Sequence, residues 1–136
     1  MNINDFINDL SEEEQINVVS KDGNAIECID NPSETVQLAA VRENGYAIGH
    51  IDNPSEEVKL AAVRENGDAI LFIKNPSEAI KLAAVRQNGS VIQFIAYASE
   101  AVQLAAVQSD PRAIIFIYNA SDELRAYANL IKLGQI

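Results

Sequence analysis

The feature that most constrains this sequence is a repeat of 22 residues. A serine recurs at this spacing six times, and a carboxylate follows it each time, as in Ser33-Glu34 and Ser55-Glu56. Such a period is typical of solenoids, because one short unit cannot bury its apolar face alone and therefore stacks on its neighbours. The period divides the 136 residues into an N-terminal segment, 1–8; five repeats, 9–30, 31–52, 53–74, 75–96 and 97–118; and a divergent C-terminal cap, 119–136.

Each repeat predicts two helices. In "NPSEEVKLAAVRENGDAILFIK", residues 53–74, Asn53 is a typical helix-capping residue and Pro54 suits the first helical position, while Glu56 favours the positive end of the helix dipole. The apolar residues that follow have the helical period and not the alternation of a strand. We expect Gly67 to end this helix in the left-handed conformation. The remaining residues leave room for a short α- or 3-10 helix.

These features predict an all-α fold, a right-handed α-solenoid of five two-helix repeats in a single domain. A leucine-rich-repeat horseshoe has a similar period and is the alternative fold. Its L-x-x-L-x-L-x-x-N strand pattern is absent from this sequence. One parallel strand in each repeat would favour the horseshoe.

Targeting signals and membrane spans are not expected. The longest apolar run, "AIIFIY" at 113–118, is much shorter than the roughly 18 residues that a membrane-spanning helix requires. The first residues, "MNINDFINDL", are acidic where a secretory signal is basic. A single cysteine, Cys28, fits a reducing compartment. The expected location is the cytoplasm.

The run "AAVRENG-x-A-I" of residues 39–48 returns in the next repeats. It resembles two groups of short α-helical repeats: the leucine-rich-repeat-variant solenoids with their alternating α- and 3-10 helices, which are HEAT-like, and an uncharacterised bacterial, phage and large-virus repeat domain with an A-A-V-K/R-x-N-G-x-A-I core. The match covers residues 31–118 well, although the fifth repeat has "SDPRA" where the second has "ENGYA". The resemblance implies a binding scaffold, and it supplies no catalytic residues.

Cys28 and His50 are the side chains most suited to nucleophilic catalysis. They hold the same position in successive repeats, where the other repeats have Phe72, Phe94 and Phe116. No third group is evident to orient the histidine, so packing in the core or in a groove is the favoured interpretation. One cysteine and one histidine do not complete the usual zinc ligand sets, and no phosphate-binding loop is present. We therefore predict no enzymatic activity, no catalytic residues, no cofactor and no metal.

Charged residues recur at two further positions. A carboxylate lies near the start of the first helix: Glu34, Glu56 and Glu78. An arginine lies near its end: Arg42, Arg64 and Arg86. Both suit the helix dipole, and the arginines are expected to pair with nearby carboxylates, either Glu43 and Glu65 or those of the next repeat. The alternatives are a row of active-site carboxylates and a phosphate-binding ladder of arginines.

The acidity of the chain is confined to its first half. Residues 1–68 contain 15 Asp and Glu against 4 Lys and Arg, a net charge of −11, whereas residues 69–136 contain 5 against 6, a net charge of +1. Helices about 10 Å apart give three repeats a length of roughly 30 Å, so this half carries about one net negative charge per 3 Å of length. Duplex DNA carries one negative charge per about 1.7 Å. We predict an acidic partner-binding face: Glu43, Asp52, Glu57, Glu65 and Asp68. The alternative is surface charge that serves solubility alone.

The second half is apolar where the first is polar. Leu71 and Ile115 take the position of Glu27, and Tyr118 takes the position of Asp30. The C-terminal cap covers these apolar residues, or else they bind a partner or a second copy of the chain as a homodimer.

Together these features predict a non-catalytic inhibitor that presents its acidic face to a basic, nucleic-acid-binding site of a target protein. A phage-encoded DNA mimic of the anti-CRISPR kind, acting in the cytoplasm of the bacterial host, is the specific form expected. Such a protein binds neither nucleic acid nor membrane itself. The alternative is a scaffold or adaptor that holds a protein assembly through its apolar C-terminal repeats.

Overall fold

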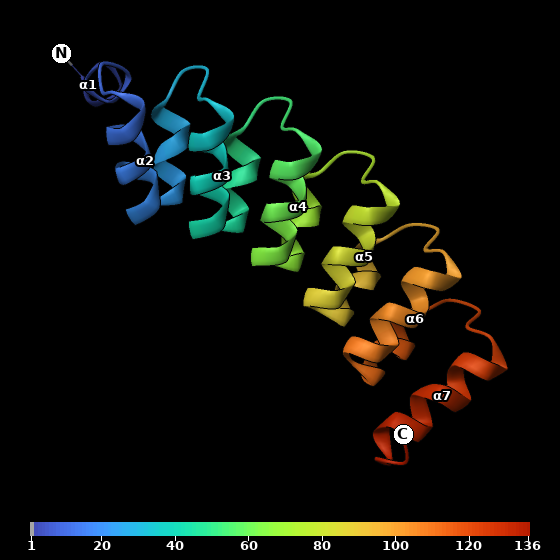
Figure 1. Cartoon of the computed structure of the whole chain (residues 1–136). Helices are drawn as coiled ribbons and strands as arrows, with labels where there is room; N and C mark the ends of the chain where they lie inside the picture. Colours follow the sequence, from blue (N-terminus) through green and yellow to red (C-terminus); the bar gives the residue numbers. More distant parts are fainter. Residues whose placement is uncertain (1) are drawn as a thin grey trace.

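The computed structural model describes residues 2–136 as an arc of stacked helices, without a strand in this range (Figure 1). The α-helices are α1 (Ile3–Asn8), α2 (Glu12–Lys21), α3 (Glu34–Glu43), α4 (Glu56–Glu65), α5 (Glu78–Gln87), α6 (Glu100–Ser109) and α7 (Asp122–Lys132). The 3-10 helices are η1 (Gly23–Cys28), η2 (Gly45–His50), η3 (Gly67–Phe72), η4 (Gly89–Phe94) and η5 (Pro111–Phe116). The predicted all-α solenoid is confirmed, and the horseshoe is wrong.

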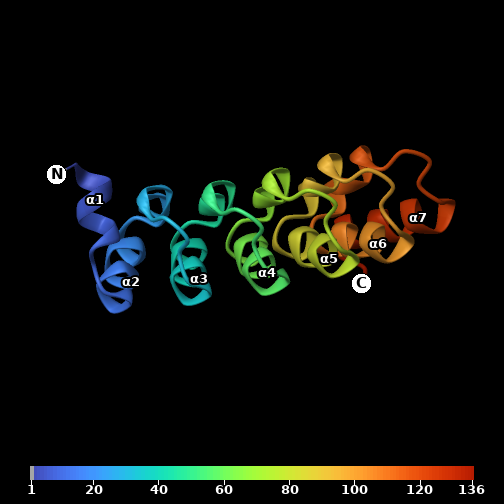
Figure 2. The same ribbon diagram turned by 90° about the horizontal axis from the view of Figure 1, so that it is seen from above.

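The two kinds of helix form two rows. Viewed from above, α2 to α5 lie in one row, and the 3-10 helices lie beside them in another (Figure 2). From α2 to α7 each α-helix packs against the next α-helix, and each 3-10 helix packs against the α-helix of the following repeat, as η2 does on α4; α1 packs against η1. Neighbouring repeats therefore share one continuous interface. The right-handed course of the chain stays a prediction.

The first helix of a repeat begins two residues later than predicted. Its cap is Ser55 and not Asn53, because the Ser55 Oγ accepts the backbone N–H of Val58 at 3.3 Å. Asn53 instead takes a left-handed backbone conformation, with φ of 48°. Asparagine tolerates this conformation better than other non-glycine residues, and a following proline disfavours the ordinary helical conformation before it. The Asn53-Pro54 pair thus forms the turn that leads into α4.

The glycine that follows each α-helix also has a different function from the one predicted. Gly67 is not among the residues with positive φ. The residue that ends α4 is Asn66, which is extended and whose side chain accepts the N–H of Asp68 at 3.0 Å to cap η3. A Cβ on Gly67 would lie 2.7 Å from the carbonyl oxygen of Ala84 in the next repeat. Glycine is required because the two backbones approach closely.

The fifth repeat keeps this geometry with other residues. Asp110 caps η5 by accepting the N–H of Arg112 at 3.0 Å, and Pro111 occupies the position that glycine holds in the other repeats. Proline suits a first helical position, but its ring fills the space that the next helix would need for close approach. Consistent with this, α7 turns away from the stack in Figure 1.

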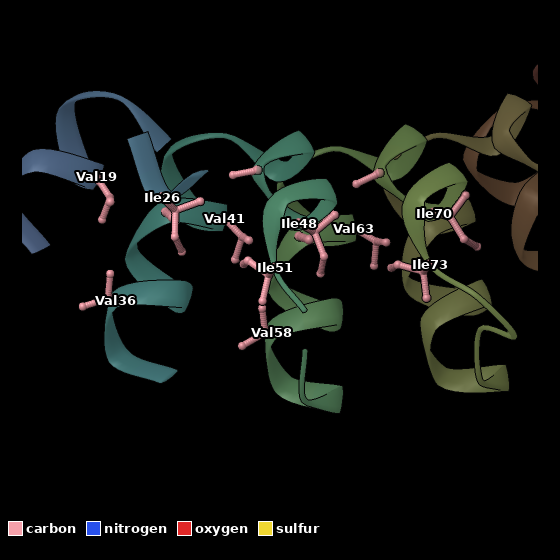
Figure 3. Packing of buried hydrophobic residues seen from close by; sticks show 14 of the residues in the cluster. Val19, Ile26, Val36, Val41, Ile48, Ile51, Val58, Val63, Ile70 and Ile73 are labelled. Carbon is pink, nitrogen blue, oxygen red and sulfur yellow. The ribbon is translucent and has the colours of Figure 1, made fainter. Parts of the chain in front are cut away.

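The core lies between the two rows and consists of small and β-branched residues. Val36, Val58 and Ile48 are buried, and they lie among equivalent residues of the neighbouring repeats (Figure 3). Burying such a side chain contributes about 1.5–3 kcal/mol. Ala62 is fully buried, and its small size allows helices to pack closely. In residues 2–136 no helix combines the length and apolar character needed to cross a membrane.

Candidate protein interface

The recurrent carboxylates at the helix starts connect successive repeats. Glu34 accepts a hydrogen bond from the Ser55 hydroxyl of the next repeat at 2.8 Å. Glu56 and Glu78 accept the equivalent bonds from Ser77 and Ser99. Each of these serines also caps its own helix. The position is thereby tied to the stacking of repeats, and no arrangement of paired acid and base is formed there.

Two of the five carboxylates predicted for the acidic face also bind within the fold. Glu43 accepts the backbone N–H of Gly23 at 2.6 Å, from the preceding repeat. Asp68 lies 3.4 Å from the hydroxyl of Tyr46, which donates to it. Substitution of either residue would disturb contacts between repeats as well as surface charge.

The other three are free for a partner. Asp52, Glu57 and Glu65 are exposed, and none has a hydrogen bond or an ion pair from its side chain within residues 2–136. Glu57 lies in the first turn of α4 and Glu65 at its last residue, about 12 Å further along the axis at 1.5 Å per residue. Asp52 lies in the loop after η2. The acidity is thus spread around the N-terminal repeats.

Very little of this charge is neutralised. Within residues 2–136 two ion pairs occur: His50 Nδ1 lies 4.0 Å from Glu27 Oε2, and Arg112 Nε lies 3.1 Å from Asp110 Oδ1. The expected pairing of the helix-end arginines with nearby carboxylates is wrong, because Arg42, Arg64 and Arg86 are exposed and none forms an ion pair in this part of the chain. The hydrogen bond from the Arg112 side chain lowers the pKa of Asp110 below its ordinary value.

The position shared by Cys28 and His50 lies at the edge of the core, where Cys28 packs against the buried residues and the aromatic residues of later repeats are exposed. Phe72, Phe94 and Phe116 at the same position are 54%, 47% and 40% exposed. Cys28 is half-buried, and His50 faces Glu27, with no hydrogen bond between the thiol and the imidazole in the described chain. These residues therefore line a surface that runs along the 3-10 helices.

The apolar candidates are also exposed. Leu71 is 58% accessible, Ile115 74% and Tyr118 89%. In the cap, Leu124 and Ala128 are buried against the last repeat. The cap thus closes the end of the core but leaves Leu71 on η3, Ile115 on η5 and Tyr118 after η5 uncovered.

Three grooves lie at equivalent positions between successive 3-10 helices and the loops that follow them. We call them the acidic groove, the Leu71 groove and the Tyr118 groove, with volumes of about 590, 520 and 330 Å³. The acidic groove is lined by Glu27, Asp30, His50 and Asp52, among others. The Leu71 groove is lined by Leu71, Lys81, Phe94, Ala96 and Tyr97, among others. The Tyr118 groove is lined by Gln93, Tyr97, Gln103, Phe116 and Tyr118, among others.

Tyr97 was not identified from the sequence. Its side chain is fully exposed, and its backbone is left-handed, with φ of 56°. The equivalent residues in the other repeats are asparagines, such as Asn75. The signal that would have found it is the loss of the Asn-Pro pair in "AYAS", residues 96–99. A tyrosine in a conformation that favours asparagine, with no packing to hold it there, points to a role at the surface.

No cluster suited to a metal ion occurs in residues 2–136, since no three His, Cys, Asp or Glu side chains converge. No polar or charged side chain of this part of the chain is buried. No family model, no curated protein and no solved structure matches the chain. The resemblance to short helical repeats stays a prediction.

Proposed function

We propose that this chain is a non-catalytic binding protein whose acidic N-terminal half docks onto a basic surface of another protein. The observation that carries the proposal is the unneutralised charge. Of the 15 carboxylates in residues 1–68, Glu27 alone lies within 4.0 Å of a basic side chain in the described chain, and that partner is His50. Because a partner's cations would meet carboxylates that no internal cation satisfies, complementary charge attracts and orients it.

The most specific form of this proposal is an inhibitor. If the basic surface is the target's nucleic-acid-binding site, docking excludes the nucleic acid. The continuous packing of neighbouring repeats supports such competition, because it spreads the carboxylates along roughly 30 Å, a length comparable to a short duplex. A nucleic-acid-dependent defence enzyme such as a CRISPR effector is the target class, with the inhibitor encoded by a phage and acting in the bacterial cytoplasm.

A second candidate function is that of a scaffold. The exposed apolar side chains of the C-terminal repeats favour it: Leu71, Ile115 and Tyr118 lie uncovered. In this case apolar contacts hold the assembly, and the acidity serves solubility. Apolar contacts are insensitive to salt, whereas docking through exposed charges weakens as ionic strength rises.

Matched charge reversals test the proposal. The partner is first isolated from the host on immobilised protein, and its association rate is then measured at low and physiological salt. Glu57→Lys with Glu65→Lys changes the net charge of residues 1–68 from −11 to −7. We expect association to slow about tenfold at low salt, because exposed charges mainly determine encounter rates.

Glu100→Lys with Glu123→Lys is the control, since it makes the same charge change in the nearly neutral half. It should slow association much less. Equal effects of the two pairs, or no effect of either, would refute docking through the acidic half and favour the scaffold.

A further inference from the structure

The three grooves form a single series along one side of the solenoid. Residues of the Leu71 groove follow those of the acidic groove by 44 positions, as Leu71 follows Glu27 and Phe94 follows His50. The Tyr118 groove follows after 22 more. The same backbone shape therefore recurs, while its chemistry changes from carboxylate to aromatic.

We propose that this series binds one extended peptide segment of the partner, with basic side chains in the acidic groove and apolar side chains in the Leu71 and Tyr118 grooves. The inference rests on the proposed function for the basic character of the partner. It adds the form of the bound segment and its path along the 3-10 helices.

Charge complementarity identifies the occupant of the first groove. Glu27, Asp30 and Asp52 line it, and no lysine or arginine does. In the Leu71 groove the equivalent of Gln37 is Lys81, and the equivalents of Glu27 and Asp52 are apolar. A basic side chain is therefore attracted to the first groove and repelled from the second, which fixes the position of the segment along the series.

Tyr97 identifies the other two grooves as sites for apolar side chains. It lines both of them, and its fully exposed side chain is therefore available to a ligand in either groove. Phe94 lines the Leu71 groove and Phe116 lines the Tyr118 groove, and both are exposed. Exposed aromatic residues are enriched where proteins bind one another, because they bury a large area with few rotatable bonds.

The repeat determines the spacing of the peptide. The acidic and Leu71 grooves are two repeats apart, or roughly 20 Å at about 10 Å per repeat, and the Tyr118 groove lies roughly 10 Å beyond. An extended chain advances about 3.3 Å per residue. The expected motif has a basic residue, an apolar residue about six positions away, and a second apolar residue about three positions further.

The test uses the labelled peptide Lys-Lys-Lys-Ser-Gly-Ser-Gly-Ser-Phe-Ser-Gly-Leu and its reversed sequence, with binding to the full chain followed by fluorescence anisotropy. We expect the better of the two to bind about tenfold or more tightly than a version with Ser in place of Phe and Leu, because each buried apolar side chain strengthens binding by about that factor. A version with Phe moved next to the lysines should lose the same advantage.

Variants of the chain connect this binding to the grooves. Tyr97→Asn restores the residue of the other repeats, so the fold is retained, and it should remove most of the advantage given by Phe and Leu. Glu27→Gln with Asp52→Asn should weaken binding and reduce its salt dependence. Glu100→Gln with Glu123→Gln, the same charge change at residues that line none of the three grooves, is the matched control and should do neither.

Three results would overturn the inference. The first is equal affinity for the anchored and serine peptides. The second is binding of the anchored peptide that Tyr97→Asn leaves unchanged. The third is self-association in analytical ultracentrifugation that Tyr97→Asn abolishes, which would assign the grooves to a second copy of the chain. A different outcome would refute the peptide path alone and leave the proposed function standing. In this outcome reversal of Glu57 and Glu65 abolishes partner binding, while none of the groove variants changes it.

Discussion

Replacement of Gly67 by alanine tests whether this glycine serves close packing or backbone freedom. The added Cβ would lie 2.7 Å from the carbonyl oxygen of Ala84 and 2.9 Å from Oε1 of Gln87. Gln87 accepts the Gly67 N–H at 2.7 Å, so its side chain cannot withdraw without losing that bond. The backbone contact must lengthen from 2.7 Å to at least 3.0 Å, which displaces the fourth repeat from the third by 0.3 Å or more.

The sign of the effect separates the two explanations. At an ordinary φ, a glycine-to-alanine change stabilises by about 0.4–1 kcal/mol, because it restricts the unfolded chain. Overpacking a rigid contact costs about 1–3 kcal/mol. We expect a net loss of about 1–2 kcal/mol. For a chain of this length each kcal/mol lowers Tm by about 3–4 °C, so the expected fall is about 3–8 °C.

Thermal and urea unfolding followed by circular dichroism at 222 nm measure the difference. Gly49→Ala is the control, because its Cβ would meet the movable ring of Phe72 at 3.2 Å and no backbone atom. It should change Tm by less than about 2 °C. An alanine at Gly67 that leaves Tm unchanged or raises it would show that the repeats are not held in contact at this point.

Three further changes test other parts of the structure. Ser77→Ala removes both the cap on α5 and the hydrogen bond to the preceding repeat. It should lower the free energy of unfolding by about 1 kcal/mol in a urea titration, and an unchanged urea midpoint would contradict the inter-repeat bond. Cys28→Ser should leave partner affinity and Tm nearly unchanged, because Cys28 is a free thiol that lines none of the three grooves, and a loss of function in a fully stable variant would reveal chemistry at this position. Arg112→Ala should raise the pKa of Asp110 toward 3.8 in an NMR titration. An Asp110 titration that the substitution leaves unaffected would refute the pairing. Because folding lowers the pKa of Asp110, the contribution of the pair to stability is present above pH 3.8 and is lost as the pH falls below that value.

The sequence was sufficient to predict the architecture, because the 22-residue period and the residue types determine the helices within each repeat. The 22-residue spacing predicted one α-helix and one short second helix in each repeat, and both are present. The boundaries were less accurate, since two residues in "NPS" are typical of helix starts. Ser55 caps the helix, and Asn53 takes the left-handed turn.

The surface was harder to predict, because it depends on contacts between repeats. Glu43 and Glu57 look alike in the sequence, yet Glu43 accepts a backbone N–H of the preceding repeat and Glu57 is free. Phe94 was expected to pack in the core or in a groove, and only the structure decides between them: it lines the Leu71 groove and is 47% exposed. Tyr97 could be recognised as a candidate binding residue only from its backbone angle φ, and that angle depends on how one repeat leads into the next.

The repeat-to-repeat contacts also make the solenoid a molecular ruler. Gly45 abuts the Ala62 carbonyl as Gly67 abuts that of Ala84, and the carboxylate at the start of one helix binds the serine of the next in each case. Insertion of a second copy of residues 53–74 ahead of residue 53 would therefore join surfaces that already match. The acidic and Leu71 grooves would then lie one repeat further apart, about 10 Å, while each groove kept the residues that line it. Gain of a whole repeat thus changes the spacing of the groove series in fixed steps, a route by which a chain of this kind can be matched to partners of different length without a change in the composition of these two grooves.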